Sequence, residues 1–348
     1  MDIRERILTA ITWGEPDRVP LTAFASTLPR GQGERLARNL GVGLVLRPPA
    51  HVERHRDVEI LSREYWQDGE RRVRRTIVTP VGEVWETLRP EGAYATSNWI
   101  VEHFIKEPDD YRVLEYYFQD AVFADNYDYI REARRRIGGD GLVYARIAKT
   151  PLQEMLYFLM GMERFALDFH TRRDLFDSLY HTMRRRYEEL FALAAGAPVE
   201  MVLMGDNISG DVVSRERFRD YIAPVYQRVR AALAGSGKLI GSHMDGRLAA
   251  LKDEIAAADV DVIEALTPPP MGNVSLAEAR ELWPGKALWI NFTSNMHIAP
   301  PAEIEAHTRQ LLADWGGKRG LAIGITEDAP VEALEKSLAI ISRVLEDY

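Results

Sequence analysis

Short apolar and β-branched runs alternate with longer amphipathic stretches along most of this chain. Eight of the runs have the length and the Val, Ile and Leu content of strands that are buried on both faces. They are RVPLTAFA (18–25), GLVLRP (43–48), LVYARI (142–147), EMVLMG (200–205), KLIGSH (238–243), DVIEAL (261–266), ALWINF (287–292) and GLAIGI (320–325). A helical pattern follows most of them, and this alternation is typical of βα units around a parallel sheet.

Several of the predicted helices have recognisable starts. The helix over 214–234 begins at Ser214, the helix over 275–282 begins with the capping box of Ser275 and Glu278, and the last helix runs from Pro330 to about 346. A further amphipathic helix is expected at the N-terminus. Eight strands with alternating helices predict an α/β fold, a (β/α)8 barrel whose reactive groups lie at the C-terminal ends of its strands.

The spacing of the predicted strands is irregular at one place. Residues 49–140 separate the second strand from the third, and within them RRVRRTIVTPVGEVWETLRP (71–90) predicts a β-hairpin that turns near residues 79–82. We therefore expect a single barrel domain over 1–348, in which 49–140 is an insertion that decorates the barrel mouth.

Three aromatic residues of this insertion are candidates for a pocket wall. They are Trp85, Tyr94 and Trp99. Aromatic side chains at a barrel mouth can contact a substrate, although they can equally be core residues of the insertion. Trp99 is the one that we assign to substrate binding.

Composition narrows the classes of function. The 348 residues are 46% hydrophobic and 28% charged, as in soluble globular proteins, and the net charge of −9 disfavours a nucleic-acid partner, which needs a basic face. The chain has no cysteine, which excludes disulfides, thiolate metal ligands and cysteine nucleophiles. Charges throughout the N-terminal segment and the lack of a long apolar run favour a cytoplasmic protein that does not contact membranes.

Polar side chains gather where the predicted strands end. Asp206 and Asn207 follow the fourth strand, His243 and Asp245 the fifth, Glu264 lies on the sixth, Asn291 on the seventh, and Glu327 and Asp328 follow the eighth. The barrel geometry would bring these groups together at one mouth. Buried strands otherwise carry few polar side chains, so this set is the candidate site.

Most of these residues also have a structural interpretation. Asp206 or Asn207 could form Asx turns, Asp245 could cap the following helix, Asp328 could cap the last one, and His243 could be a core histidine. Glu264 is harder to explain in this way, because a carboxylate inside a buried strand is costly unless it is paired or bound to a metal.

Together these residues form a plausible metal-binding set with nitrogen and oxygen donors. A histidine and carboxylates from different strands suit zinc with an open coordination position, or another divalent ion. The predicted ligands are His243, Asp245, Glu264 and Glu327.

Five segments of the chain resemble the uroporphyrinogen decarboxylase superfamily. They are RERILTAITWGEPDRVPLT at the N-terminus, RRTIVTPVGEVWE followed by WIVEHFIKEPDDY, SRERFRDYIAPVYQRV, and SHMDGRLAALKDEIAAADVDVIEAL. The resemblance covers nearly the whole chain and implies the barrel fold. The superfamily also includes the corrinoid-linked methyltransferases that make methyl-coenzyme M, and its members are often homodimers.

The chain departs from both branches of this superfamily. Decarboxylases carry an arginine-rich RQAGR loop after the first strand that grips substrate carboxylates; here STLPRGQGERLAR stands there, with Arg30 as the nearest equivalent. Methyltransferases carry His-x-Cys after the fifth strand and a second cysteine near the last strand, which bind zinc. Here these positions hold His243-Met-Asp245 and, near the last strand, Glu327. An oxygen-rich ligand set would leave the metal a stronger Lewis acid, suited to polarising an oxygen of the substrate.

The leading hypothesis is an enzyme, a metal-dependent methyltransferase that moves a methyl group between a small-molecule substrate and a corrinoid protein carrying methylcobalamin. In it Asp206, Asn207 and Glu264 act catalytically, while Arg30, Asn291 and Trp99 bind substrate. The alternative is a decarboxylase of a small carboxylated substrate that uses strand-end carboxylates, Asp206 or Glu264, as acid and base. A non-catalytic binding protein on the same fold is a third possibility, because barrels support many functions.

Overall fold

The computed structural model describes residues 1–28, 31–90, 98–327 and 329–348. The chain divides into two compact units. The first comprises Met1–Ala50, Asn126–Ile147 and Ala194–Tyr348, and the second His51–Asp125 and Ala148–Leu193. The sequence pattern predicted one insertion at 49–140, whereas the second unit also takes a later segment of mainly helical residues.

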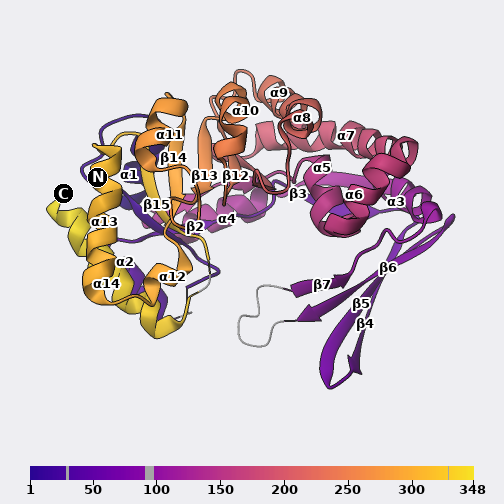
Figure 1. The fold of residues 1–348 in the computed structure, drawn as a ribbon, viewed down its shortest axis with the longest axis horizontal. Helices are drawn as coiled ribbons and strands as arrows, with labels where there is room; N and C mark the ends of the chain where they lie inside the picture. The colour runs from indigo at the N-terminus through magenta and orange to yellow at the C-terminus, as the bar shows by residue number, and fades with distance from the viewer. Residues whose placement is uncertain (29–30, 91–97, 328) are drawn as a thin grey trace. The chain divides into compact units, whose positions relative to one another are not determined.

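The first unit is a parallel β-barrel surrounded by helices (Figure 1). Its strands are β1 (Leu21–Phe24), β2 (Gly43–Leu46), β9 (Gly141–Val143), β10 (Ala145–Arg146), β11 (Met201–Ile208), β12 (Leu239–Met244), β13 (Val262–Leu266), β14 (Ala287–Asn291) and β15 (Leu321–Ile325). Their order in the sheet is β10-β11-β12-β13-β14-β15-β1-β2-β9. Because β9 and β10 are parts of one predicted strand, separated only by Tyr144, the sheet nearly closes, and all eight predicted strands are confirmed.

The helices of the first unit follow the strands as the βα pattern predicted. They are α1 (Ile3–Ile11), α2 (Gln32–Asn39), α4 (Tyr127–Ile137), α8 (Arg215–Arg217), α9 (Ala223–Ala232), α10 (Lys252–Ala257), α11 (Leu276–Leu282), α12 (Ser294–His297), α13 (Pro301–Trp315) and α14 (Val331–Asp347). The Ser214 side chain accepts from the backbone N–H of Arg217, and Ser275 and Glu278 form the predicted capping box. Both helix starts are therefore confirmed.

The barrel interior is filled by side chains that alternate along each strand. Leu142 and Tyr144, Met201 and Leu203, and Val262 belong to one buried cluster. Since successive side chains of a strand point to opposite faces, this cluster defines which residues of every strand point inward. The next inward positions toward the C-terminal ends form the barrel mouth.

Helix α1 closes the other end of the barrel. Its Ile7 and Ile11 belong to the same buried cluster, and its backbone accepts a hydrogen bond from Gly320, just before β15. Burying two isoleucine side chains contributes about 1.5–3 kcal/mol each. The N-terminal helix is therefore an integral part of the barrel core.

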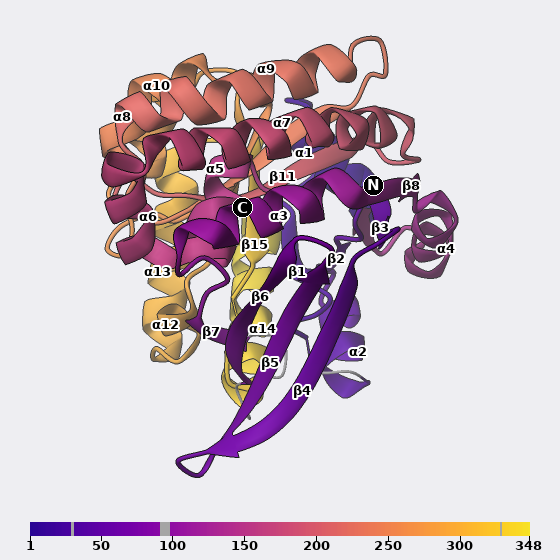
Figure 2. The same ribbon diagram turned by 90° about the vertical axis from the view of Figure 1, so that its right-hand side faces the viewer.

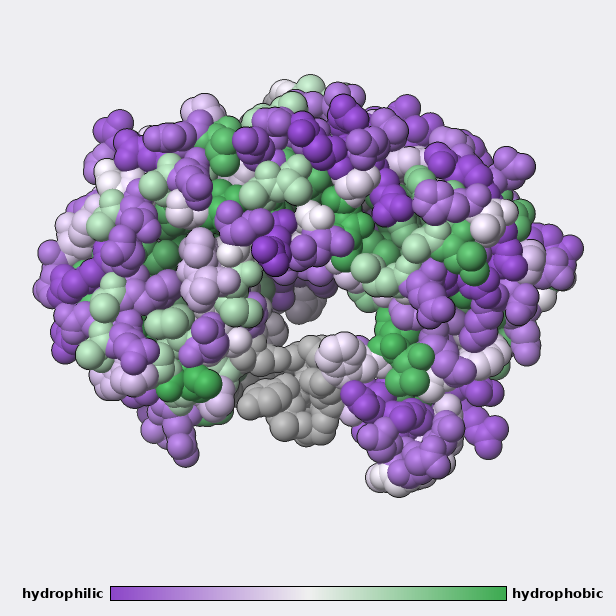
Figure 3. All heavy atoms as spheres, in the orientation of Figure 1, coloured by the Kyte–Doolittle hydropathy of each residue, from purple (hydrophilic) through white to green (hydrophobic). Residues whose placement is uncertain are grey.

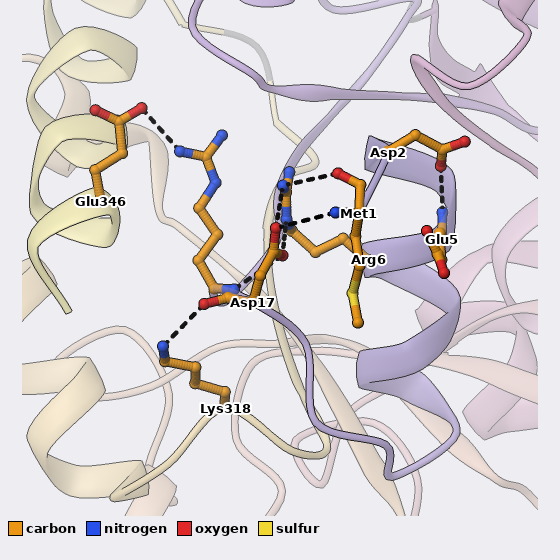
Figure 4. A network of polar contacts seen from close by, with 8 residues as sticks. Met1, Asp2, Glu5, Arg6, Asp17, Lys318 and Glu346 are labelled. Atoms are coloured by element: carbon orange, nitrogen blue, oxygen red, sulfur yellow. Dashed lines mark hydrogen bonds and ion pairs between the residues drawn. The ribbon is translucent and has the colours of Figure 1, made fainter.

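A network of charges fixes α1 to the chain that leads into β1 (Figure 4). The Arg6 guanidinium donates to both carboxylate oxygens of Asp17, at 2.6 and 2.8 Å, and Lys318 donates to the Asp17 carbonyl oxygen at 2.9 Å. The neighbouring Arg18 pairs with Glu346 of α14 at 2.8 Å. The hydrogen bonds and charge of Arg6 hold the pKa of Asp17 well below its usual range.

The second unit combines two small antiparallel sheets with helices. Its strands are β3 (His51–His55), β4 (Glu59–Gln67), β5 (Glu70–Thr79), β6 (Gly82–Pro90), β7 (Asn98–Glu102) and β8 (Ala121–Asp125). Its helices are α3 (Pro108–Asp120), α5 (Pro151–Glu154), α6 (Gly161–Thr171) and α7 (Arg173–Gly196), with a π-helical stretch over Met155–Met160. The buried Asp168 of α6 accepts a hydrogen bond from Tyr111 of α3 at 2.9 Å, so the later segment is bonded to the earlier one.

The predicted hairpin is confirmed. Thr79 pairs with Gly82 across a two-residue turn, and β4, β5, β6 and β7 form one twisted sheet in which β4 and β5 extend farthest (Figure 2). The β4 side chains are exposed except for the half-buried Tyr65, and the surface around the β4–β5 turn is mostly hydrophilic on the face shown in Figure 3. In the described part of the chain, no helix has both the length and the apolar character that crossing a membrane requires.

Candidate functional site

His243 and Glu264 meet at the barrel mouth. They are register partners on the adjacent strands β12 and β13, and both follow inward-facing residues. The Nδ1 atom of His243 lies 2.5 Å from Oε2 of Glu264. Glu264 is fully buried, and its other oxygen, Oε1, has no hydrogen-bond partner among the described residues. A buried carboxylate with one unsatisfied oxygen is suited to hold a further donor or a cation.

Asp245 lies on the other side of the His243 ring. The Nε2 atom of His243 is 3.9 Å from Oδ2 of Asp245. Burial raises the pKa of Asp245, the charges of Glu264 and Glu327 raise it further, and His243 opposes them. The following helical turn begins only at Ala249, with Leu248 as its cap residue. Asp245 is thus not a helix cap, and that alternative is wrong.

Glu327, which follows β15, accepts hydrogen bonds from two neighbours. Asn291, which is buried at the end of β14, donates from Nδ2 to Glu327 Oε1 at 2.8 Å, and the Ser294 backbone N–H donates to Oε2 at 3.0 Å. Thr326 Oγ1 in turn donates to Asn291 Oδ1 at 2.7 Å. Asn291 therefore orients Glu327, a role that its assignment to substrate binding did not foresee.

Asp206 points away from the mouth. Its carboxylate accepts a hydrogen bond from the Tyr226 hydroxyl of α9 at 2.8 Å, and the same hydroxyl lies 2.7 Å from Ser242 Oγ. Asp206, Tyr226 and Ser242 are all buried. This network joins β11 and β12 to the helix layer, so we assign Asp206 a structural role. Asn207, the next residue, is half-buried on β11 and lies where the register with β12 shifts, between Met204 and Ile208.

The assignments of the other two predicted substrate-binding residues stay predictions. Trp99 lies on β7 of the second unit and is 58% exposed. Arg30, like Tyr94 and Asp328, lies outside the described residues. The described site therefore consists of His243, Asp245, Glu264, and Glu327 with Asn291.

Two inward-facing arginines at the mouth were missed by the sequence analysis. Arg47 comes directly after β2, two residues beyond the inward-facing Val45. Arg146, which is exposed, ends β10 two residues beyond the inward-facing Tyr144. The Arg47 guanidinium lies 3.3 Å from the centre of the Phe24 ring, and Arg146 Nε donates to the Arg47 carbonyl oxygen at 3.0 Å. Desolvation by the surrounding protein and, after it, the charge of Arg47 lower the pKa of Arg146, even though part of its side chain reaches solvent. Period-two alternation within the predicted strands GLVLRP and LVYARI could have found them.

Tyr144 lies one inward position below Arg146. It is fully buried, and its ring packs edge-on against Trp289, with 6.0 Å between ring centroids. Burial and the Glu264 charge raise the pKa of its hydroxyl well above the usual value, while Arg47 and Arg146 oppose them. The pKa of Tyr144 thus depends both on Glu264 and on the two arginines of the mouth.

The residues at the mouth fit a divalent metal ion in donor type. One imidazole and three carboxylates would offset its charge, and the buried Glu264 Oε1 lacks a partner among the described residues. Across that part of the chain, however, no three His, Asp or Glu side chains already form a group that could hold a metal. Binding would therefore require side-chain rearrangement, which Asp245 and Glu327 can make because both reach solvent.

Comparison with solved structures supports the fold. Over all of this chain and 99% of the other, the structure is similar to a "methyltransferase from Methanosarcina mazei", with a TM-score of 0.62 and 14% sequence identity. It is also similar, at a TM-score of 0.41 and 12% identity over 94% of this chain and 95% of the other, to a sugar phosphate isomerase/epimerase from Parabacteroides distasonis. The second score is too low to carry an argument.

Comparison of the sequence identifies the family. No curated protein matches the chain. The family model described as "Uroporphyrinogen decarboxylase (URO-D)" matches residues 99–343, which is more than half of the chain. The chain therefore belongs to the uroporphyrinogen decarboxylase family, as the resemblance of its sequence segments predicted.

Proposed function

We propose that this protein is a metal-dependent methyltransferase that moves a methyl group between a small-molecule substrate and a corrinoid protein. The observation that carries the proposal is the contact between His243 Nδ1 and Glu264, which directs Nε2 toward Asp245 at the mouth. The family and the similarity of the fold to a methyltransferase support the same reaction class.

In this proposal His243 Nε2 and Asp245 are metal ligands, and Glu327 is a further candidate ligand. Glu264 accepts a hydrogen bond from the Nδ1–H of His243 and is a positioning residue, because such a carboxylate fixes the tautomer and the orientation of a ligating imidazole. This assignment differs from the expected direct ligation by Glu264. When bound, the metal would supply a Lewis acid that polarises an oxygen or sulfur of the substrate.

Asn291 orients one of the candidate ligands, because its amide holds Glu327 in place. A rigid barrel mouth suits methyl transfer, because the acceptor atom must lie in line with the methyl donor. A corrinoid protein is the expected donor, and a homodimer is the expected assembly.

A methyl-transfer assay tests the proposal. The protein is reconstituted with Zn²⁺ and mixed with methylcobalamin and a panel of thiols, phenols and small carboxylates, and the loss of the methyl–cobalt absorbance is followed. We expect turnover by the wild type, a loss of at least about 100-fold in Asp245→Ala, and unchanged turnover in Asp253→Ala, which removes an exposed carboxylate of α10. Equal turnover by the Asp245 and Asp253 variants would contradict the metal assignment, and no turnover by the wild type would contradict the reaction.

A second candidate function is decarboxylation of a small carboxylated substrate. The specific observation in its favour is the matched family, whose name describes a decarboxylase. Asp245 would then act as the acid that protonates the substrate carbanion, which remains after CO2 has been released. Release of CO2 from a carboxylate panel by chelator-treated protein, without methyl transfer by the reconstituted protein, would favour this function over the first.

A further inference from the structure

Arg47 and Arg146 differ from most arginines of the first unit. Arg4, Arg38 and Arg134, for example, each pair with a carboxylate at 2.9 Å or less. Among the described residues, neither Arg47 nor Arg146 has such a partner, although three carboxylates stand elsewhere in the same mouth. No carboxylate of the described residues therefore balances their charges.

The two side chains are also held beside each other. Arg146 is tied to the Arg47 backbone by the bond from its Nε, and the Arg47 guanidinium is stacked on Phe24. Two like charges on adjacent positions repel each other, and this repulsion is only partly screened by water, because Arg47 is half-buried and Arg146 is exposed. The charge of Arg47 also contributes, after desolvation, to the lowered pKa of Arg146, in agreement with this repulsion. An anion between or above the guanidiniums would remove it.

Guanidinium groups match one class of ligand especially well. Their planar N–H groups bind the paired oxygens of carboxylate, sulfonate and phosphate groups through charge-assisted hydrogen bonds. Asp245 and Glu264, the acidic residues that His243 faces, would repel the same anion. A molecule with an anionic group at one end therefore has a preferred orientation in this mouth.

We propose that Arg47 and Arg146 form an anion subsite that holds the oxyanion end of the substrate, with its reacting end directed to His243 and Asp245. The substrate class is accordingly a small molecule that carries a carboxylate, sulfonate or phosphate group. Tyr144 is influenced by both Glu264 and Arg47, so the two sides belong to one interior. The second half of this inference, the reacting end, rests on the proposed function; the anion subsite itself does not.

Binding of simple anions tests the subsite without turnover. Sulfate, phosphate and succinate are titrated by calorimetry into the full chain at constant ionic strength set with chloride. We expect binding by the wild type that weakens at least about tenfold in Arg146→Ala and is partly restored in Arg146→Lys. Arg131→Ala removes an exposed arginine that pairs with Asp128 on α4, and should bind as the wild type does.

Two results of this titration would overturn the subsite. One is no detectable binding of any of the three anions by the wild type, and the other is an equal loss in Arg146→Ala and Arg131→Ala. If a substrate is found in the methyl-transfer assay, Arg146→Ala should raise its KM at least about tenfold, and an unchanged KM would also overturn it. Anion binding that depends on Arg146, together with no methyl transfer by the wild type, would instead reject the proposed function and retain the subsite.

Discussion

The Nδ1 atom of His243 lies 2.5 Å from a carboxylate oxygen of Glu264, a buried residue of the neighbouring strand. This contact selects the tautomer of His243 that carries its proton on Nδ1 and turns Nε2 toward the mouth. Replacing Glu264 by methionine, which has a similar volume but no strong acceptor, should therefore lower zinc affinity about 10–100-fold. The zinc affinity should fall less in Glu264→Gln, because glutamine keeps a hydrogen-bond acceptor.

The tautomer of His243 separates this positioning role from a merely structural one. In ¹⁵N NMR spectra, His243 should carry its proton on Nδ1 in the wild type and lose this preference in Glu264→Met. Glu281→Gln on the exposed side of α11 is the matched control and should change neither tautomer nor affinity. An unchanged tautomer in Glu264→Met would show that another group orients the ring.

Asp206 should matter for stability rather than for chemistry. Tyr226→Phe removes the hydroxyl that donates to the buried Asp206 carboxylate, and should lower the free energy of unfolding by about 1–3 kcal/mol. The kcat of the folded protein should stay unchanged, because the network faces the helix layer. Urea denaturation and turnover measured on the same samples check both statements; a large fall in kcat with normal stability would restore Asp206 to the catalytic site.

The Arg6–Asp17 pair should stabilise the protein modestly. Asp17 is 43% exposed, so solvent screens the pair, and Asp17→Asn should cost about 1 kcal/mol at 0.1 M salt and less at 1 M. Because the pKa of Asp17 is lowered by folding, its contribution is complete above about pH 4 and is lost as the pH falls below this value. A cost that is the same at both salt concentrations would indicate packing by Arg6 instead.

His297 should make the fold sensitive to mild acid. Burial lowers its pKa from 6.5 to about 4, and its Nδ1 atom lies 2.5 Å from Ser337 Oγ. Above pH 6.5 the folded and unfolded forms are both neutral at this residue. As the pH falls from 6.5 to 4, only the unfolded chain takes up the proton, so about 3 kcal/mol of stability is lost.

The comparison of wild type with His297→Gln isolates this effect. Burial also lowers the pKa of His307, whose ring likewise packs on Phe292, so part of the acid sensitivity should persist in the variant. We expect the free energy of unfolding, measured with denaturant at pH 7.5, 6, 5 and 4.5, to fall less steeply with decreasing pH in His297→Gln than in the wild type. Parallel curves for both proteins would contradict the assignment.

The local pattern of the sequence was sufficient for the barrel but not for the second unit. A strand buried on both faces appears as an apolar run, and a capping box such as Ser275 with Glu278 lies within four residues, so both could be predicted. The assignment of 148–193 to the second unit depends on contacts such as Tyr111 with Asp168, which are 57 residues apart and leave no local pattern.

The candidate site was predictable to a similar degree. Strand ends indicated His243, Asp245 and Glu264, because polar residues are costly there without a function. The orientation of the Asp206 side chain was not predictable, because it depends on the hydroxyl of Tyr226, which lies in a helix 20 residues later. Arg47 and Arg146 were accessible through alternation, yet only the structure revealed that they adjoin each other without a carboxylate partner among the described residues.

The metal content of the protein tests the proposed site at His243 most directly. The wild type, His243→Ala, and His170→Ala as an exposed control on α6 are purified without chelator, incubated with Zn²⁺, desalted and analysed by mass spectrometry. If a metal site lies at the barrel mouth, we expect about one zinc ion per chain in the wild type and the control, and far less in His243→Ala. A wild type that retains no zinc, or a His243→Ala variant that retains as much as the wild type, would contradict it.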